Sequence, residues 1–415
     1  MKMLYKILSL ALCIVLLVSI FVGCKSSSSD KVQVDVWHNW NVEEGGTEYI
    51  LKVLVDEYNA SQDKVEVKLI SQPSDGFSDK VYSSVSIGTG PDIFFNFATA
   101  VPQYVEGGFL ADMGKYMDTD ALQARIPSSM WEECTGADGK LHIVPIQTSA
   151  SVLFYNETLY NELGLAAPVT WEDVENNAKA IYEQKGIPGF AVDSYIDLAQ
   201  ILFCQSGATY IDTATKTVGF NTPECAELLK WFAKGVEAGY FAANFESGSI
   251  DGDFNGGLLG SFLGSCTYEP YILPYGFTYG VAPSPLGGVQ DWTPIFSRGA
   301  IVFASDEETE SAACDFLSFF TNKTNSARWA EAIGSLSPYN DSQKESAYLN
   351  YVANSKVLTE AVKSMEYAYS TPAVVGAPVV RNELKQLFLQ VIGGVKTAEE
   401  ALSEAEANCN AALQG

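Results

Sequence analysis

Two periods of apolar residues organise the first hundred positions of the chain. Residues 32–37 and 65–69 alternate apolar and polar side chains, which predicts strands, and the apolar run 93–95 predicts a short buried strand. Apolar residues at helical spacing predict a helix over 47–58 and another around 81–88. This alternation of strand and helix is typical of an α/β domain with a mostly parallel sheet.

The alternation continues through the rest of the chain. A helix predicted over 171–184 has Thr170 at its N-cap and Asp173 at N3, where an acid interacts favourably with the helix dipole. A strand is predicted over 188–192, after that helix. Further amphipathic helices are predicted over residues 223–235, 306–320, 383–391 and 397–413.

An apolar leader precedes the first predicted strand. Lys2 and Lys6 supply a short positive region before an apolar run over 7–22, so residues 1–23 are typical of a secretory signal peptide. A retained single-span anchor is the alternative, because such a run, at ~1.5 Å per residue, comes close to spanning a ~30 Å hydrocarbon core. Either form directs the rest of the chain out of the cytoplasm.

The leader ends in a sequence that predicts lipidation. Phe21-Val22-Gly23-Cys24 resembles the lipobox of bacterial lipoproteins, in which the cysteine is lipid-modified and becomes the first mature residue. The residues after it, 24–30, are rich in serine and predict a flexible tether. We therefore expect a protein anchored through Cys24 on the extracytoplasmic face of the cell membrane.

Length and charge narrow the function. About 390 residues follow the leader, which is too long for one ordinary core and predicts two lobes. The formal net charge of −26 repels phosphate backbones and anionic lipid, so nucleic-acid binding is not expected, and membrane contact is expected only through the anchor.

The cysteines beyond Cys24 contain no CxxC pair and no metal-like cluster. They are Cys134, Cys204, Cys225, Cys266, Cys314 and Cys409. Their apolar contexts predict buried free thiols, although export permits disulfides, and a Cys204–Cys225 bridge is the exception that we consider. No metal site is expected.

Short motifs in a fixed order resemble those of the family 1 extracellular solute-binding proteins of sugar ABC importers. They are Gly90-Pro91-Asp92-Ile93, residues 107–112, 139–145, 154–159 and 163–174, Phe254-Asn255-Gly256-Gly257, residues 280–285 and 334–338. The chain departs from the family pattern in having Leu258-Leu259-Gly260 after Gly257 and Arg298-Gly299 where the family has two glycines.

The resemblance implies an α/β fold of the type II periplasmic-binding-protein kind. Two lobes, each a mostly parallel sheet flanked by helices, would hold ligand in the cleft between them. The first lobe would comprise residues 31–145 with 300–338, and the second residues 146–299 with 339–415. The implied function is that of the substrate-binding component of an ABC importer, a monomer that binds a mono- or oligosaccharide and delivers it to the permease.

Two other functions stay open at this point. Arg298 is the only Lys or Arg between Lys234 and Lys323, so the same role for a polyol phosphate such as glycerol 3-phosphate is the first alternative. A secreted glycan-acting hydrolase is the second, but the chain lacks a Gly-x-Ser-x-Gly elbow and a His-Glu-x-x-His motif. We therefore expect no enzymatic activity and no cofactor.

A sugar presents a C–H face that suits aromatic rings and a rim of hydroxyls that needs polar partners. Candidates at strand ends in the first half of the chain are Asn39, Trp40, Asn96, Phe97, Gln147, Ser149 and Tyr155. For Phe97 and Tyr155, packing is the competing interpretation.

Further candidates lie in the second half of the chain. They are Ser265, Tyr268 and Glu269 after the Gly-rich segment 260–264, Trp292 and Arg298 around the next strand, and Tyr339 after Ser337-Pro338. The Gly-rich segment lacks the Gly-Lys-Ser/Thr of a nucleotide-binding loop, so it predicts close backbone approach instead. A structural ion pair is the competing interpretation of Arg298.

Overall fold

The computed structural model describes residues 31–46, 48–135, 138–245 and 247–415. The leader, Cys24 and the tether lie outside the described residues. Within the described part of the chain, no helix combines the length and the apolar character that a membrane span needs.

The predicted strand–helix alternation opens the fold. In chain order the elements are β1 (Val32–His38), α2 (Tyr49–Ser61), β2 (Val65–Ser71), α3 (Phe77–Ser86) and β3 (Ile93–Phe97). β1 lies between β2 and β3 and is parallel to both, as the βαβ pattern predicts. Val34 and Val36 on β1 are fully buried, because alternate residues of a strand face the same side.

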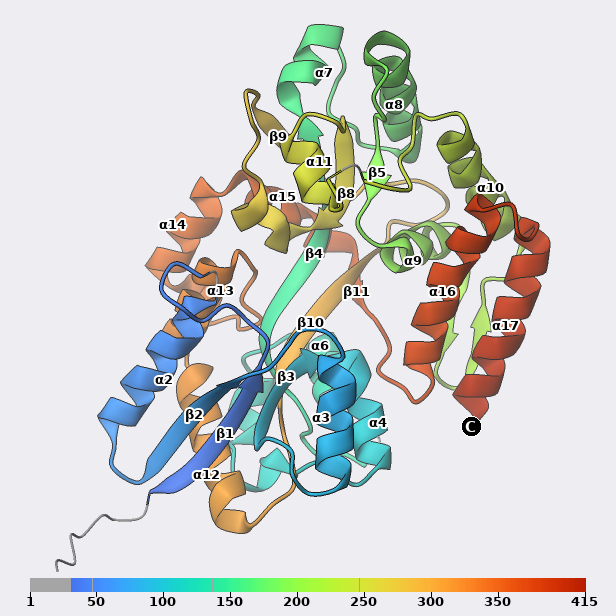
Figure 1. Cartoon of the computed structure of the whole chain (residues 1–415). Helices are drawn as coiled ribbons and strands as arrows, with labels where there is room; N and C mark the ends of the chain where they lie inside the picture. Colours follow the sequence, from blue (N-terminus) through green and yellow to red (C-terminus); the bar gives the residue numbers. More distant parts are fainter. Residues whose placement is uncertain (1–30, 47, 136–137, 246) are drawn as a thin grey trace, which may run out of the picture.

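Two long strands connect the halves of the molecule. β4 (Val144–Asn156) and β10 (Thr293–Val302) pair antiparallel in the centre of a sheet of order β2-β1-β3-β10-β4-β8-β5 (Figure 1). The register shifts between Arg298 and Gly299. A Cβ at Gly299 would lie 2.4 Å from Ile143 Cγ1, so this position of the crossing accepts only glycine without a local shift.

Strand directions differ between the two halves of the sheet. Beyond β4, β8 (Ser261–Ser265) and β9 (Tyr279–Pro283) run antiparallel to β4, and only β5 (Ala191–Val192) is parallel to β8. The mostly parallel order expected for each lobe therefore describes the first half, whereas the second is mixed. The reason is that β4 extends from the first lobe into the second as one strand. In the second lobe, β8 and β9 pair with it in the opposite direction.

Smaller strands and helices complete the chain. The strands are β6 (Thr209–Asp212), β7 (Thr217–Gly219) and β11 (Ala368–Ser370). The helices of the middle of the chain are α4 (Val101–Glu106), α5 (Thr119–Gln123), α6 (Ser128–Cys134), α7 (Glu157–Leu163), α8 (Trp171–Lys185), α9 (Tyr195–Gln205), α10 (Pro223–Glu237) and α11 (Ile250–Asn255). Those of the last third are α12 (Glu307–Phe320), α13 (Lys323–Ile333), α14 (Ser346–Asn354), α15 (Lys356–Ser364), α16 (Ala377–Ile392) and α17 (Ala398–Gln414). Thr170 and Asp173 form a capping box at the start of α8, as predicted.

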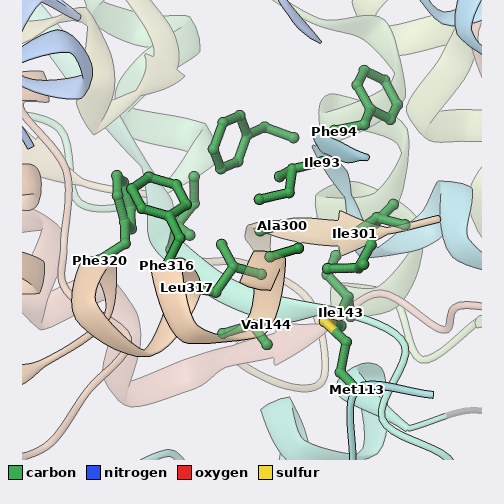
Figure 2. Packing of buried hydrophobic residues seen from close by; sticks show 14 of the residues in the cluster. Ile93, Phe94, Met113, Ile143, Val144, Ala300, Ile301, Phe316, Leu317 and Phe320 are labelled. Atoms are coloured by element: carbon green, nitrogen blue, oxygen red, sulfur yellow. The ribbon is translucent and has the colours of Figure 1, made fainter. Parts of the chain in front are cut away.

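Two large hydrophobic cores define two lobes. The core of the first lobe joins β1, β3, the first-lobe end of β10 and α12, and Figure 2 shows Phe94, Ile301 and Phe316 in it. The main core of the second lobe lies among α8, α9, α10, α16 and α17. Each lobe has its own core, and the paired strands β4 and β10 connect the two.

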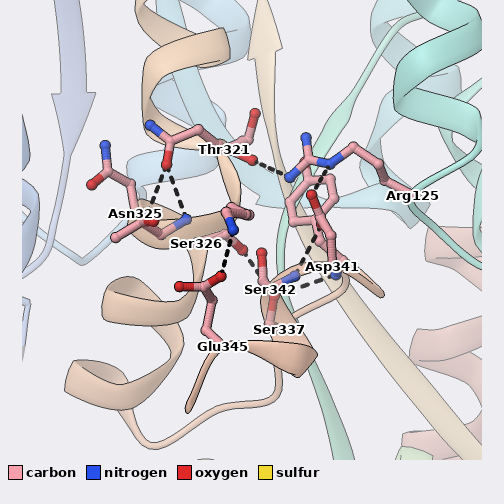
Figure 3. Close-up of polar contacts among 12 residues, drawn as sticks. Arg125, Thr321, Asn325, Ser326, Ser337, Asp341, Ser342 and Glu345 are labelled. Carbon is pink, nitrogen blue, oxygen red and sulfur yellow. Dashed lines mark hydrogen bonds and ion pairs between the residues drawn. The ribbon is translucent and has the colours of Figure 1, made fainter. Parts of the chain in front are cut away.

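A polar network ties the segment after α12 to the first lobe (Figure 3). The guanidinium of Arg125 donates from Nε to Asp341 at 2.9 Å and from Nη2 to the carbonyl of Thr321 at 2.8 Å. The Arg125 side chain also lies over the ring of Tyr339, 4.3 Å from its centroid. These contacts fix α13, whose residue Trp329 lies at the site described below.

All six cysteines of the described residues are buried and free. The expectation of buried thiols is confirmed, and the Cys204–Cys225 bridge that we considered does not form. Cys225 instead has its Sγ 3.7 Å from the hydroxyl of Ser206, and burial raises the pKa of the Cys225 thiol.

Candidate functional site

Arg298 lies on β10 at the crossing between the lobes. Its guanidinium lies between two aromatic rings, 5.3 Å from the centroid of Trp40 and 4.8 Å from that of Phe97. The Nε of Arg298 is buried and has no hydrogen-bond partner among the described residues. Burial lowers the pKa of Arg298, and the charge of Glu48 opposes that shift. A partly buried arginine with an unused donor can bind an oxygen-rich ligand.

An aromatic chamber of about 130 Å³ opens on one side of Arg298. We use this name for the cavity lined by Trp40, Glu48, Gln147, Thr267, Tyr271, Arg298, Trp329 and Ile333. Trp40 and Glu48 come from the first lobe, Gln147 from the crossing strand β4, and Thr267 and Tyr271 from the 3₁₀ helix η3 (Cys266–Tyr271) that follows β8. Both lobes therefore contribute to this chamber.

A polar chamber of about 240 Å³ opens on another side of Arg298. It is lined by Asn39, Ser74, Gly76, Phe77, Ser78, Asp79, Phe94, Phe95, Asn96 and Arg298. Apart from Arg298, these residues come from the loop after β1, from β3, and from the start of α3 with the loop before it. The chamber therefore lies at the carboxyl ends of parallel strands, where α/β sheets bind ligands. Arg298 lines both chambers and joins them into one site.

Packing holds the polar and aromatic side chains of the site in place. The ring of Trp40 stacks on Phe95 with centroids 5.0 Å apart and tilts against Trp329 at 5.4 Å. The Oδ1 of Asn96 accepts a hydrogen bond from the backbone N–H of Phe97 at 2.8 Å, which orients the amide. These contacts fix the orientations of Trp40 and Asn96 on the first-lobe side of the site.

Glu48 gives the aromatic chamber a negative charge. It occupies the N-cap position of α2 but makes no side-chain capping hydrogen bond. Burial raises the pKa of Glu48, while backbone hydrogen bonds and the charge of Arg298 lower it. The arginine ion pairs of the described residues involve Arg125 and Arg328 but not Arg298. Glu48 and Arg298 thus influence each other across the chamber without contact.

The structure brings six of the predicted site residues together. These are Asn39, Trp40, Asn96, Phe97, Gln147 and Arg298. The structural ion pair considered for Arg298 is absent from the described residues, whose salt bridges do not include it.

Predicted residues of the second lobe lie near the site but engage other protein groups. Ser265 caps η3 and its hydroxyl lies 2.8 Å from that of Thr267. The hydroxyl of Tyr268 donates to Asp193 at 2.5 Å, and Glu269 accepts a hydrogen bond from Ser355 at 2.6 Å.

The other predicted residues pack away from the two chambers. Tyr339 is fully buried, and its hydroxyl donates to the carbonyl of Pro145 at 2.7 Å. Trp292 stacks parallel to Tyr369 with centroids 6.1 Å apart, and Tyr155 packs against Tyr160. Ser149 is buried on β4 opposite Phe296.

Sequence reasoning missed four lining residues that matter for the chemistry: Glu48, Thr267, Tyr271 and Trp329. Thr267 and Tyr271 flank the predicted pair Tyr268 and Glu269, but the 3₁₀ geometry of η3 turns them toward the chamber instead. Glu48 follows Gly45-Gly46 at the start of a predicted helix, where an acid is ordinarily explained by the helix dipole.

A different environment lies on the other face of β10. Ser297 lines a small cavity of about 20 Å³ with Glu133, Thr371 and Arg381. Glu133 also lines a rear cavity of about 460 Å³, a name that we use for the space bounded by Val101, Pro102, Val105, Glu106, Glu133, Thr135, Ile211, Asp212, Thr213, Lys216, Ala373, Val374, Val375 and Leu413. Burial raises the pKa of Glu133 to about 7, and the Ser370 and Ser297 hydroxyls lower it slightly.

Comparison with known proteins places this site in context. Residues 53–356 match the model of a family described as bacterial extracellular solute-binding protein. The chain is 25% identical over 299 residues to the maltotriose-binding protein of Pyrococcus abyssi, and the match covers 70% of this chain but 62% of that relative, less than two thirds of its length.

Solved structures share the fold over nearly the whole chain. The cyclic alpha-maltosyl-1,6-maltose binding protein of Arthrobacter globiformis superposes with a TM-score of 0.78 at 27% identity, over 92% of this chain and 99% of that one. UgpB of Mycobacterium tuberculosis, solved with glycerophosphocholine, superposes with a TM-score of 0.79 at 17% identity, over 92% and 98%. At that lower identity the likeness is one of fold alone.

Proposed function

Because the chain belongs to the family of bacterial extracellular solute-binding proteins, we propose that it binds a carbohydrate around Arg298 and delivers it to the permease of an ABC importer. Members of this family work outside the cytoplasm, and they bind substrates for transport rather than transform them. The single observation that carries the carbohydrate assignment is the site in which a buried guanidinium, an aromatic ring and amide side chains converge between the lobes.

The site matches both parts of a sugar. The chamber face of Trp40 offers an aromatic surface for a C–H face of the ring. Gln147, Thr267 and Glu48 line the same space and supply donors and acceptors for hydroxyls. Each buried hydroxyl without a partner would cost about 1–3 kcal/mol, so such a set discriminates strongly among polar ligands.

The charges of the site favour a neutral sugar over a polyol phosphate. Among the residues that the structure describes, Arg298 is the only cation that lines the two chambers, whereas Glu48 and the exposed Asp79 contribute two carboxylates. A phosphate dianion would face net negative charge there. The relatives named for maltotriose and for a cyclic maltosyl sugar support the same choice, and they make α-linked glucose oligomers the first ligands to test.

The proposal includes the anchor and the oligomeric state. We propose that Cys24 carries the lipid that keeps the receptor beside its permease, and that the protein binds ligand as a monomer. The Ser-rich segment 24–30 supports this arrangement because it is a flexible polar linker between Cys24 and the folded chain.

A calorimetric screen tests the function. Purified protein lacking residues 1–23 is titrated with glucose, maltose, maltotriose, a cyclodextrin and glycerol 3-phosphate, and each mixture is afterwards analysed for cleavage. Binding of a neutral sugar with no cleavage supports the proposal, and bound ligand stabilises the fold by RT ln(1 + [L]/Kd). Binding of the phosphate alone would replace the ligand class, and cleavage of a sugar would replace the function.

A further inference from the structure

Two opposite charges face the aromatic chamber without pairing. Glu48 and Arg298 both line the cavity of about 130 Å³, and each shifts the pKa of the other. Elsewhere in the described chain, opposite charges in more exposed positions do pair, as Arg125 does with Asp341 at 2.9 Å and Arg328 with Glu57 at 2.7 Å. Glu48 and Arg298 instead face the same cavity without forming an ion pair.

Neither charge is paired with an opposite charge that would explain its position. The guanidinium of Arg298 lies between the rings of Trp40 and Phe97, which restrict its plane but leave Nε without a partner. Glu48 stands at the start of α2 without capping it. Backbone hydrogen bonds reach the Glu48 carboxylate, but it has no cation beside it, and the buried Nε of Arg298 has no partner among the described residues. A ligand that hydrogen-bonds to both groups would offset the cost of their partial desolvation.

A hydroxylated, uncharged ring satisfies both groups at once. Neighbouring sugar hydroxyls can donate to a carboxylate and accept from a guanidinium, and hydrogen bonds to charged groups are the stronger kind. An acidic sugar could pair with Arg298 only by bringing its negative charge beside Glu48, and an amino sugar could pair with Glu48 only by bringing its positive charge beside Arg298, because both groups line the same small chamber. We propose that Glu48 is a specificity-determining residue that, with Arg298, restricts the cleft to uncharged sugars. The inference rests on the carbohydrate function proposed above.

The test compares three variants at one position and its neighbour. Glu48→Gln keeps the shape and removes the charge, Glu48→Asp keeps the charge, and Glu44→Gln removes an exposed charge of the same loop that does not line the chamber. Calorimetry measures affinity for maltose and maltotriose as neutral probes, for maltobionate and glucuronate as acidic probes, and for glucosamine as a basic probe. Thermal unfolding of each variant without ligand verifies that it folds.

The expected result is a change in selectivity at position 48 alone. In Glu48→Gln the affinity for the neutral probe falls about tenfold, since one charge-assisted hydrogen bond is lost. The affinity of the same variant for the acidic probe rises. The ratio of the neutral-probe affinity to the acidic-probe affinity therefore falls by more than tenfold relative to wild type. Glu48→Asp restores the preference for the neutral probe, and Glu44→Gln does not alter it.

Each other outcome has a distinct meaning. A wild-type protein that binds the neutral probe but shows no change of ratio in Glu48→Gln overturns this inference and leaves the proposed function standing. A wild-type protein that prefers the acidic probe overturns the inference directly. A wild-type protein that binds no probe sugar overturns the proposed function, and the inference with it. If Glu48→Gln does not fold, Glu48→Asp and Glu48→Ala replace it. An unchanged affinity ratio in Glu48→Asp with a shifted ratio in Glu48→Ala supports the inference, and an unchanged ratio in both variants overturns it.

Discussion

Ser297 and Arg298 are neighbours on β10, yet they face two different environments. Arg298 lies between the two ligand chambers among amides, hydroxyls and aromatic rings. Ser297 faces the small cavity at Glu133, next to the rear cavity. The rear cavity is larger, at about 460 Å³ against about 240 Å³ and 130 Å³, and residues of both lobes line it too.

The comparison shows that volume alone does not identify a sugar site. The walls of the rear cavity combine apolar side chains such as Val105 and Leu413 with polar ones such as Asp212 and Lys216, so hydrogen-bonding groups are present on both faces. Among the described residues, however, no aromatic side chain lines the rear cavity. The smaller chambers present donors, acceptors and rings together, so the aromatic surface that suits the C–H face of a sugar favours the side of Arg298.

The largest expected effect is a loss of sugar affinity when Arg298 is replaced but not when Ser297, on the opposite face of β10, is replaced. Arg298→Met preserves the packing between Trp40 and Phe97 but removes the donors, and we expect sugar affinity to fall about 100-fold, since two charge-assisted hydrogen bonds are lost. Stability should change little because a buried charge without an ion pair is removed. Ser297→Ala, the matched control on the opposite face, should leave the affinity measured by calorimetry unaltered. An equal loss of sugar affinity in Arg298→Met and Ser297→Ala would show that the sugar does not bind specifically on the Arg298 side of β10.

Glu133 on the rear face predicts a pH dependence of the unfolding free energy. Its pKa is about 7 in the folded protein against 4.5 for an unperturbed carboxyl, so the folded state binds the proton more tightly than the unfolded state. The stability contributed by this proton is complete below pH 4.5 and is lost as the pH rises through 7. Between pH 5 and pH 8 the loss amounts to about 2 kcal/mol.

Urea unfolding at several pH values measures this contribution. Glu133→Gln should reduce the slope of the stability profile between pH 5 and pH 8 relative to wild type but not remove it, because burial also raises the pKa of Asp197 to about 7. Glu132→Gln, which alters an exposed neighbour, should retain the wild-type slope. A wild-type profile that Glu133→Gln does not alter would show that the carboxyl is ionised and solvated in the folded state.

Trp40 provides a smaller, more local test of the ligand side. Trp40→Ala removes the ring that faces the aromatic chamber and lowers sugar affinity about tenfold, because stacking contributes about 0.5–1.5 kcal/mol beyond the buried area. Trp292→Phe, which alters a stacked tryptophan of the second lobe, should retain wild-type affinity. Unchanged binding by Trp40→Ala, in a protein that still unfolds cooperatively, would remove Trp40 from the site.

The smallest expected effect concerns Tyr339. Tyr339→Phe removes the hydroxyl that donates to the carbonyl of Pro145 and leaves that buried acceptor unpaired. We expect unfolding free energy to fall by about 1 kcal/mol and ligand affinity to stay as in wild type. A clear loss of ligand affinity in Tyr339→Phe would show that Tyr339 contributes to the ligand site, as its position in the sequence predicts.

Local patterning predicted most of the fold. The strands at Val32 and Val65 and the helix capped by Thr170 depend on neighbours in the chain, and all three form as predicted. The mixed strand directions of the second lobe depend on which strands return beside β4, and no local pattern encodes that choice. The exact boundaries of the two lobes and the anchor at Cys24 stay predictions.

The candidate site was predictable where it follows strand ends. Asn39 and Asn96 come directly after predicted strands, and Arg298 lies on the strand that connects the lobes. All three line the polar chamber. Tyr339 was placed there because it follows a Ser-Pro turn, but an isolated bridge between Leu336 and Thr148 folds its segment against β4 and buries the ring. The rear cavity assembles from segments far apart in sequence, so only the tertiary structure reveals it.

The most direct test of the account is a crystal structure of the protein with the sugar that binds most tightly in the calorimetric screen. We predict that the sugar lies between the lobes with one ring against Trp40, with hydroxyls within hydrogen-bond distance of Arg298 and Glu48, and with Thr267 or Tyr271 closing over it. A sugar seated in the rear cavity beside Glu133, or one that contacts neither Trp40 nor Arg298, would contradict the central claim.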